Sequence, residues 1–282
     1  MIKPVLQDDV FLEDVSRAKQ NSSQLHLWWL GQSGFLIQWQ GRHLLVDPYL
    51  SDSLTKKYAG TNKPHIRMTE RVIAPERLDF VDVVTSSHNH TDHLDGETLI
   101  SLWSVNPNLR MIVSQANVGF AAQRLQVSPE RLTPIRADGE PIHISPFTFH
   151  AIPSAHETLE QNENSDHRFI GLIIQAGQWT IYHSGDCVLY DGLVERLKNS
   201  KIDIALLPIN GRDPVRGVAG NFTAEEAAHL GTQIGAGLVI PCHYEMFEFN
   251  SVAPDGFINA AEKLGQKYRQ MKCGDRLDLE SV

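Results

Sequence analysis

Cysteine is scarce in this chain of 282 residues, and long apolar runs are missing. The three cysteines, Cys187, Cys242 and Cys273, are an odd number at irregular spacing, which argues against a disulfide framework. No apolar run approaches the ~18 residues that a membrane-spanning helix needs. The first residues are rich in acids and lack the apolar segment of a secretory signal peptide. These absences favour a soluble cytoplasmic protein without a membrane partner.

An excess of positive charge is missing too. The formal net charge is −9, and the sequence has no basic run and no stripe of arginines. Nucleic-acid binding draws much of its affinity from side chains that neutralise phosphates, so we expect no extended nucleic-acid partner. A small anionic substrate remains compatible with this charge, because a local pair of arginines beside cations is enough to bind one. Self-association into a homo-oligomer is left open.

Strand-like and helix-like segments alternate along the chain, and no linker or break in composition divides them. This alternation predicts a layered α/β fold, and the length permits one core, so we expect a single domain over residues 1–282. The strand-like segments are 25–30, 35–39, 43–46, 82–86, 110–113, 147–152, 169–175, 180–182, 204–207 and 238–241. The helix-like segments are 97–105, 116–125, 188–197, 223–234 and 256–264. Thr223 and Glu226 have the spacing of a capping box, which makes that helix start the firmest boundary.

The run of residues 87–93 packs three imidazoles and a carboxylate into one short loop after an apolar, strand-like segment. In extended backbone, His88 and His90 point to one side, and a turn can then direct Asp92 and His93 to a second point. First-row divalent metals prefer imidazole nitrogen and carboxylate oxygen as ligands. Chance produces this pattern on the order of once per thousand such sequences, so we favour metal binding over a polar surface loop. The loop predicts half of the ligands of two adjacent metals.

Two metals need more ligands, and three isolated candidates follow other strand-like segments. They are His156, Asp186 and His243. Loops at strand ends carry chemistry on a rigid scaffold, although a lone His or Asp there is more often a cap or turn residue. Together with the histidine-rich loop, the metal interpretation is favoured.

The order HxHxDH, His, Gly-Asp, His resembles that of the metallo-β-lactamase-fold hydrolases. Segments 28–37 and 44–48 resemble that family's opening hairpin, and 206–211 resembles a later strand and turn. Around Asp186 and His243 the chain is most similar to the branch that contains L-ascorbate-6-phosphate lactonase. The resemblance implies a four-layer αββα sandwich and two divalent metal ions, either zinc or manganese, with iron also compatible. It also implies the ligands: His88, His90 and His156 on the first metal, Asp92, His93 and His243 on the second, and Asp186 bridging both.

Other polar residues near these ligands have expected supporting roles. Asp92 would orient the nucleophile as well as bind metal. His183 is expected either to hydrogen-bond behind the ligands or to protonate the leaving group, with a metal-bound water as the alternative acid. Asp47 is expected to orient a ligand imidazole. The remaining histidines are interpreted as structural or exposed: His26, His43, His65, His143, His150, His167 and His229.

Three polar segments are candidates for substrate binding. Segment 56–71 contains Arg67, and loop 210–221 contains Asn210, Arg212 and Arg216. An arginine there would bind a phosphate or carboxylate with two hydrogen bonds, although solvated surface arginines are commoner. Loop 157–166, directly after His156, is the third candidate, with a solvated loop as the alternative.

Two cations about 3.5–4 Å apart share a water and lower its pKa toward ~7, so that hydroxide attacks a carbonyl or phosphoryl centre. The leading hypothesis is a metal-dependent hydrolase of a small anionic ester, most of all a lactone. The alternative is a phosphodiesterase for RNA ends, cyclic nucleotides or phospholipid head groups. A non-hydrolytic redox protein or degenerate binding module is disfavoured, because redox relatives have Glu at the position of His90 and a degenerate module would lack ligands.

Overall fold

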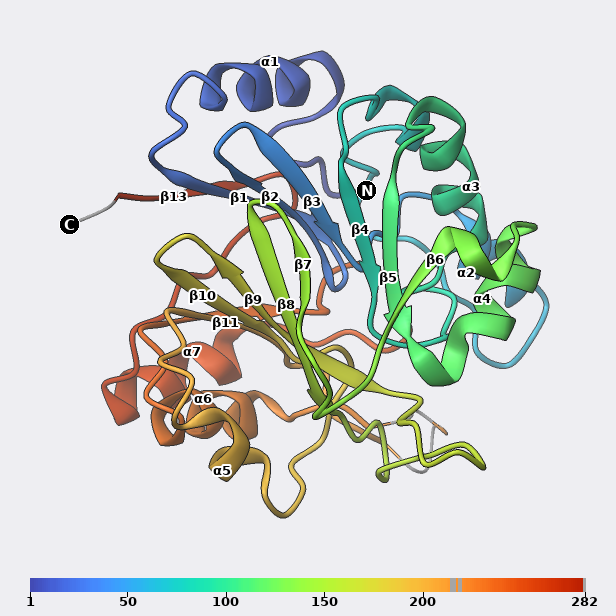
Figure 1. Ribbon diagram of the computed structural model, residues 1–282. Helices are drawn as coiled ribbons and strands as arrows, with labels where there is room; N and C mark the ends of the chain where they lie inside the picture. Colours follow the sequence, from blue (N-terminus) through green and yellow to red (C-terminus); the bar gives the residue numbers. More distant parts are fainter. Residues whose placement is uncertain (214–216, 218–219, 281–282) are drawn as a thin grey trace.

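The computed structural model describes residues 1–213, 217 and 220–280 and has four layers (Figure 1). Two β-sheets lie in the middle, and helices cover the outer side of each. The first sheet is covered by α1 (Asp8–Ala18), α3 (Gly96–Val105) and α4 (Val118–Leu125). The second is covered by α6 (Ala224–Gln233) and α7 (Asp255–Leu264). The expected αββα sandwich is confirmed.

The first sheet has seven strands in the order β13-β1-β2-β3-β4-β5-β6. Strands β13 to β3 pair antiparallel, and β3 to β6 pair parallel. The strands are β1 (Leu25–Gly31), β2 (Gly34–Trp39), β3 (Arg42–Val46), β4 (Val83–Ser86), β5 (Arg110–Ser114), β6 (Leu132–Ile135) and β13 (Arg276–Leu279).

The second sheet has six strands in the order β12-β11-β10-β9-β8-β7. Here β10, β11 and β12 are parallel, and β7 to β10 are antiparallel. The strands are β7 (Ile142–Ile144), β8 (Phe147–Pro153), β9 (Ile170–Ala176), β10 (Trp179–His183), β11 (Ile204–Pro208) and β12 (Leu238–Cys242). Strand β9 runs opposite to its two neighbours, β8 and β10, so β8 and β10 point in the same direction. Because β12 is parallel to β10, all three of these strands end at the same edge of the sheet.

The core follows from strands that are buried on both faces. In β1 every residue is buried, and alternate side chains join different apolar clusters. Leu27 and Trp29 pack between the sheets, whereas Trp28 and Leu30 pack under the outer helices with Phe11 of α1. A strand covered on both sides is largely apolar, and in β1 only His26 departs from this rule.

Several elements differ from those predicted. The helix expected over 188–197 is reduced to α5 (Leu193–Leu197), because Val188 N donates to Ala155 O and Gly192 adopts a φ of 94°. The elements α1, α2 (Ser53–Lys57), β6, β7 and β13 were not expected. Single turns of 3-10 helix lie at Pro75–Arg77, Gln115–Asn117 and Pro129–Arg131. None of the helices in the described ranges is long and apolar enough to cross a membrane.

The two sheets are joined by backbone hydrogen bonds at the end where β4, β8, β10 and β12 finish. Ile170 N, at the start of β9, donates to Ser87 O just after β4 at 3.1 Å. His243 N, just after β12, donates to Gln32 O in the β1–β2 turn at 2.9 Å. Loops from both sheets are therefore held against one another at this end.

The capping box predicted at α6 is present, and it allows a test of the fold. Thr223 Oγ1 accepts a hydrogen bond from Glu226 N, and Thr223 N donates one to Glu226 Oε2. Replacing Thr223 with Ala removes the acceptor of the Glu226 N–H group and should lower the free energy of unfolding by about 1 kcal/mol. Urea denaturation measures the change.

The matched control is Thr232→Ala in the last turn of the same helix. Thr232 is exposed, and its hydroxyl donates only to Ala228 O at 3.3 Å. An exposed substitution of this kind changes stability by no more than about 0.5 kcal/mol. Equal losses in the two variants would contradict the capping role of Thr223.

Candidate metal centre

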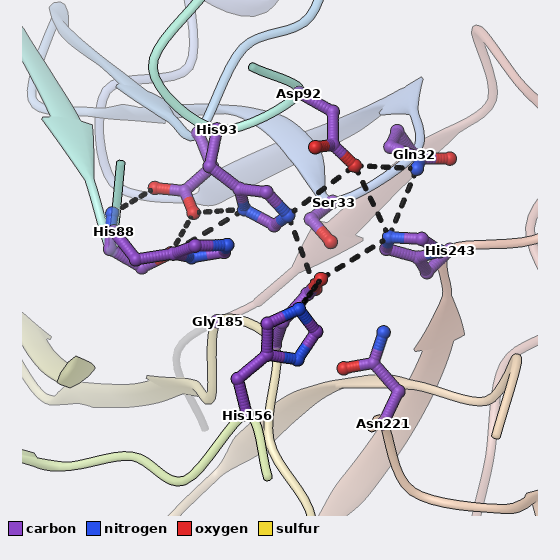
Figure 2. A network of polar contacts seen from close by, with 12 residues as sticks. Gln32, Ser33, His88, Asp92, His93, His156, Gly185, Asn221 and His243 are labelled. Carbon is purple, nitrogen blue, oxygen red and sulfur yellow. Dashed lines mark hydrogen bonds and ion pairs between the residues drawn. The ribbon is translucent and has the colours of Figure 1, made fainter. Parts of the chain in front are cut away.

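The structure brings all seven expected ligands to one place, where loops from both sheets meet. Figure 2 labels five of them, His88, Asp92, His93, His156 and His243. The loop after β4 supplies the HxHxDH residues. The loops after β8, β10 and β12 supply one ligand each. These three are His156, Asp186 and His243.

The ligands fall into two groups that share one member. In each group, one ligand atom per residue lies within 4.8 Å of the others. The first group is His88, His90, His156 and Asp186, and the second is Asp92, His93, Asp186 and His243. The division is the one that the family resemblance implies, with Asp186 common to both groups.

Asp186 lies at the centre, and its carboxylate is almost fully buried. Its Oδ1 is 3.1 Å from His93 Nε2, and its Oδ2 is 3.6 Å from His243 Nε2 and 3.7 Å from His156 Nε2. Imidazoles from three loops therefore present Nε2 to one carboxylate.

The imidazoles are held through their other nitrogen. Nδ1 of His93 is 2.7 Å from Asp47 Oδ2, Nδ1 of His156 is 2.6 Å from Gly220 O, and Nδ1 of His88 is 3.0 Å from Ser87 Oγ. Nε2 of His88 is buried and makes no hydrogen bond among the described residues, whereas Nε2 of His93 faces the carboxylates of Asp186 at 3.1 Å and Asp92 at 3.6 Å. A hydrogen bond to one ring nitrogen fixes the ring so that the other nitrogen is directed to a metal.

Asp47 follows β3 and is fully buried behind the ligands. Besides His93, it accepts hydrogen bonds from Ser87 N at 2.9 Å and from Ser87 Oγ. It also lies close enough to His88 and His93 to form a third group of possible ligands. Because its oxygens already accept hydrogen bonds from Ser87 and His93, we interpret it as the residue that orients His93.

Gly185 allows Asp186 to approach this network. Its φ is +60°, and a Cβ there would lie 2.8 Å from both Cβ and Oγ of Ser87. A side chain at this position would push the turn away from the loop after β4. The Gly-Asp pair of the sequence is thus explained by close packing as well as by ligation.

Gln32 is a site residue that the sequence did not reveal. It lies in the β1–β2 turn, and its Nε2 is 2.9 Å from both Asp92 Oδ2 and His243 Nε2 (Figure 2). The only signal was its place in the turn segment Gly31–Gly34, between two strands. A carboxamide there fixes Asp92 and His243 relative to each other.

Carboxylates and imidazoles shift one another's pKa strongly. Burial raises the pKa of Asp186, but His93 and His243 outweigh burial and bring it well below its ordinary value. Asp92 behaves in the same way, with His93 again the strongest neighbour. Burial lowers the pKa of His93, yet Asp186 and Asp92 raise it well above normal. For His243 the same competition raises the pKa to about 9.

The other imidazoles are shifted in the opposite direction. Burial lowers the pKa of His88 well below its ordinary value and that of His90 to about 4, and neighbouring imidazoles lower both further. These rings are neutral at pH 7, the form that binds metal. Divalent cations would replace the protons that the carboxylates favour on His93 and His243, because metal ligands must be deprotonated. The residues present therefore fit two divalent metal ions of the kind that accept nitrogen and oxygen ligands.

A pocket of about 440 Å³ opens over the ligands. Asp92 and Asp186 are its only acidic lining residues in the described part of the chain. Three cationic side chains line it, Lys57, Lys63 and Arg124. Its aromatic wall consists of Tyr58, His65, Phe120, Phe247 and Phe249.

Arg67 does not line this pocket. Its guanidinium donates to Asp52 Oδ1 at 2.7 Å, to Thr69 O at 3.2 Å and to Ser51 O, and it packs over Tyr49. These contacts use its donors within the fold. The interpretation of Arg67 as a substrate contact is wrong.

The predictions for loop 210–221 have mixed outcomes. Arg212 forms two hydrogen bonds of 2.7 Å with Glu226 and does not line the pocket, so its predicted role in substrate binding is wrong. Asn210 is buried and bonds to Asn221 and Asn250, which do line the pocket, so it reaches substrate only through them. Arg216 lies outside the described residues.

His183 is buried away from the pocket. Its Nε2 is 3.0 Å from Ser33 O, and its Nδ1 accepts a hydrogen bond from Gly185 N at 3.3 Å. Both ring nitrogens face backbone, so the interpretation of His183 as the acid is wrong. Its contacts hold the turn before Asp186.

Loop 157–166 does not line the pocket in the described structure. It folds on itself through a bridge between Gln161 and His167, and Asp166 pairs with Arg136 at 3.2 Å. Of the two interpretations left open by the sequence, a substrate loop and a solvated loop, these contacts favour the solvated loop.

Comparisons with known proteins agree with this geometry. A family model described as a beta-lactamase superfamily domain matches residues 42–244, which include all seven ligands. A UPF0173 metal-dependent hydrolase of Sulfurisphaera tokodaii is 24% identical over 261 residues, which cover 90% of this chain and 99% of that protein.

Two further proteins are similar to most of this chain. A probable L-ascorbate-6-phosphate lactonase of Escherichia coli is 22% identical over 271 residues, covering 83% of this chain and 73% of that protein. The solved structure of Igni18, a metallo hydrolase of Ignicoccus hospitalis, has a TM-score of 0.67 at 20% identity and covers 92% of this chain and 100% of that one. The chain therefore belongs to the beta-lactamase superfamily and is a metal-dependent hydrolase with the metallo-β-lactamase fold.

Proposed function

We propose that this protein uses two divalent metal ions, zinc or manganese, to hydrolyse a small anionic ester, with a lactone as the leading substrate. The observation that carries the proposal is the pocket, in which two adjacent ligand groups form the floor and lysines line the wall. Its volume of about 440 Å³ is in the range of small-molecule sites.

The cationic wall supports an anionic substrate. Lys57 Nζ donates to Thr91 Oγ1 at 3.2 Å, and Lys63 Nζ donates to Gly217 O at 2.8 Å. Each ammonium group has three donors, so each retains hydrogen-bonding capacity toward a ligand. Arg124 instead donates to Asn89 O and Leu94 O and lies over Phe120, so it mainly holds the loop of ligands. In a chain of net charge −9, this local positive surface favours capture of one small anion.

The protein's own residues would bind and orient the reactants. His88, His90 and His156 would hold one metal, Asp92, His93 and His243 the other, with Asp186 shared. Asp92 is 14% exposed, lines the pocket and is held by Gln32, and these contacts support a role in orienting an attacking water. When bound, two such cations supply a water of lowered pKa and neutralise charge that develops on the substrate oxygen.

A lactone is preferred over a phosphodiester for two reasons. One relative is named a probable L-ascorbate-6-phosphate lactonase, and the substrate in that name combines a phosphate group with a cyclic ester. The net charge of −9 opposes RNA as a substrate, because phosphate neutralisation by basic residues supplies much of RNA binding. Phosphodiesterase action on a small substrate is the second candidate, since a two-metal site supports that chemistry too.

The test of the proposal is a substrate screen of protein loaded separately with manganese and zinc. Phosphorylated and neutral lactones, small phosphodiesters and a short RNA are compared by kcat/KM. We expect the fastest turnover with a phosphorylated lactone. Faster cleavage of any phosphodiester would replace the lactone proposal with the second candidate.

Metal content gives a prediction that does not depend on substrate. The reconstituted protein should contain close to two metal equivalents per chain, measured by elemental analysis. Asp186→Ala should lose more metal than His90→Ala, because Asp186 belongs to both groups of ligands and His90 to one. His150→Ala, on β8 but in neither group, is the control and should keep both metals. Saturation at zero metals, or small and equal losses in the two ligand variants, would contradict the assignment.

The lysines give a prediction about substrate charge. Lys57→Gln and Lys63→Gln should each raise KM about three- to tenfold for a phosphorylated substrate, because each removes a charged contact worth about 1 kcal/mol or more. KM for the neutral analogue should change little. Arg110→Gln, a cation on β5 outside the pocket, is the control. An equal effect of the lysine variants on charged and neutral substrates would show that these side chains do not recognise the anion.

A further inference from the structure

Ester hydrolysis needs a group that delivers a proton to the leaving oxygen, and the buried His183 cannot reach the pocket. Five pocket-lining residues outside the ligands have ionisable side chains in the described structure. They are Lys57, Tyr58, Lys63, His65 and Arg124. Only an imidazole has an ordinary pKa near neutrality, which efficient proton transfer at neutral pH requires.

The contacts of His65 fix its ring. Nδ1 lies 2.9 Å from Lys63 O, so Nδ1 carries a proton and donates it to that carbonyl. The ring stacks on Tyr58 with 4.4 Å between centroids and an interplanar angle of 24°. Phe247 meets it edge-on at 5.1 Å, and Phe249 lies at 5.4 Å. Three aromatic rings and one carbonyl therefore leave the imidazole a single fixed orientation.

This orientation leaves Nε2 as the working nitrogen. No hydrogen bond to His65 Nε2 is recorded among the described residues, and the ring is half-buried in the wall of the pocket that also contains Asp92 and His243. With Nδ1–H held by Lys63 O, Nε2 of the neutral ring has a lone pair that accepts a proton. After it does so, the Lys63 carbonyl stabilises the resulting cation.

The electrostatic surroundings are compatible with transfer in both directions. Burial lowers the pKa of His65, and Lys57 and His243 lower it further, whereas the Lys63 carbonyl and Asp92 raise it. The other candidates are less suited. The ammonium groups of Lys57 and Lys63 and the guanidinium of Arg124 belong to classes that ordinarily release a proton only well above neutral pH.

We propose that His65 is a catalytic residue that carries a proton from the attacking water to the leaving oxygen of the substrate. The inference rests on the proposed hydrolase function of the same pocket. The water oxygen forms a bond to the carbonyl carbon or phosphorus, and one water proton passes to Nε2 of His65. As the bond to the leaving oxygen breaks, Nε2 returns the proton to that oxygen. The imidazole ends neutral, and one water has been added across the ester.

The test compares two esters of the same acid with different leaving groups, chosen from the class that the wild-type enzyme hydrolyses. One ester releases 4-nitrophenolate, which leaves without being protonated. The other releases an alkoxide, which must be protonated as it leaves. His65→Gln and His65→Phe should lower kcat for the alkyl ester by about a hundredfold, the order of magnitude of general acid–base catalysis. For the 4-nitrophenyl ester kcat should fall by less than about threefold.

Two features separate this role from a structural one. His65→Phe keeps an aromatic ring in the stack with Tyr58 and Phe247, and His229→Gln, exposed on α6, is the matched control that should leave both esters unaffected. Metal content and thermal unfolding of each variant are measured alongside. Unchanged metal content with a loss confined to the alkyl ester supports the proposal.

Equal losses for both esters would overturn the role of His65 and leave the hydrolase function standing. If Tyr58→Phe lowers kcat for the alkyl ester alone and the His65 variants do not, the proton donor is the phenol of Tyr58. That result would also overturn the role of His65. If the metal-loaded wild type hydrolyses no ester, both the hydrolase proposal and this inference fail.

Discussion

The buried carboxylate of Asp186 is the constraint on which the site depends. An ion taken out of water costs several kcal/mol unless it is paired and hydrogen-bonded. The fold meets this cost with imidazoles of His93, His156 and His243, whose Nε2 atoms lie 3.1–3.7 Å away. Each of these residues follows a different strand, so the pairing holds only while both sheets keep their relative position. The hydrogen bonds from Ile170 N to Ser87 O and from His243 N to Gln32 O keep it so.

The parts of the site that the sequence predicted are those whose signals are local. The spacing of the histidines and the aspartate within residues 87–93 indicates ligands for two metals. This signal depends only on the local sequence and not on the residues that pack around the loop. Asp186 and His243 were found because each is among the first polar residues after a strand-like segment. The ten expected strands are all present for the same reason, since each is an apolar run between polar turns. The missed strands β6, β7 and β13 are short, and most of their residues are at least partly exposed, so their sequences lack that contrast.

The errors concern contacts between residues far apart in the chain. Arg67 and Arg212 were taken for substrate residues because their partners, Asp52 and Glu226, are not evident from sequence. His65 was taken for a structural or exposed residue, since only the fold brings Phe247 and Phe249 to its ring and opens the pocket beside it. Gln32 and the pocket lysines were overlooked because glutamine and lysine are ordinary residues of turns and surfaces. Ligand types are thus readable from sequence, whereas the pocket wall depends on tertiary packing.

The central claim is that seven side chains bind two neighbouring metal ions with Asp186 between them. The most direct measurement is a crystal structure of manganese-loaded protein with anomalous scattering data. The account predicts two anomalous peaks about 3.5–4 Å apart, a spacing typical of two-metal hydrolytic sites. One peak should lie among His88, His90 and His156 and the other among Asp92, His93 and His243, with Asp186 in contact with both. No peak at this position, or two peaks without Asp186 between them, would contradict it.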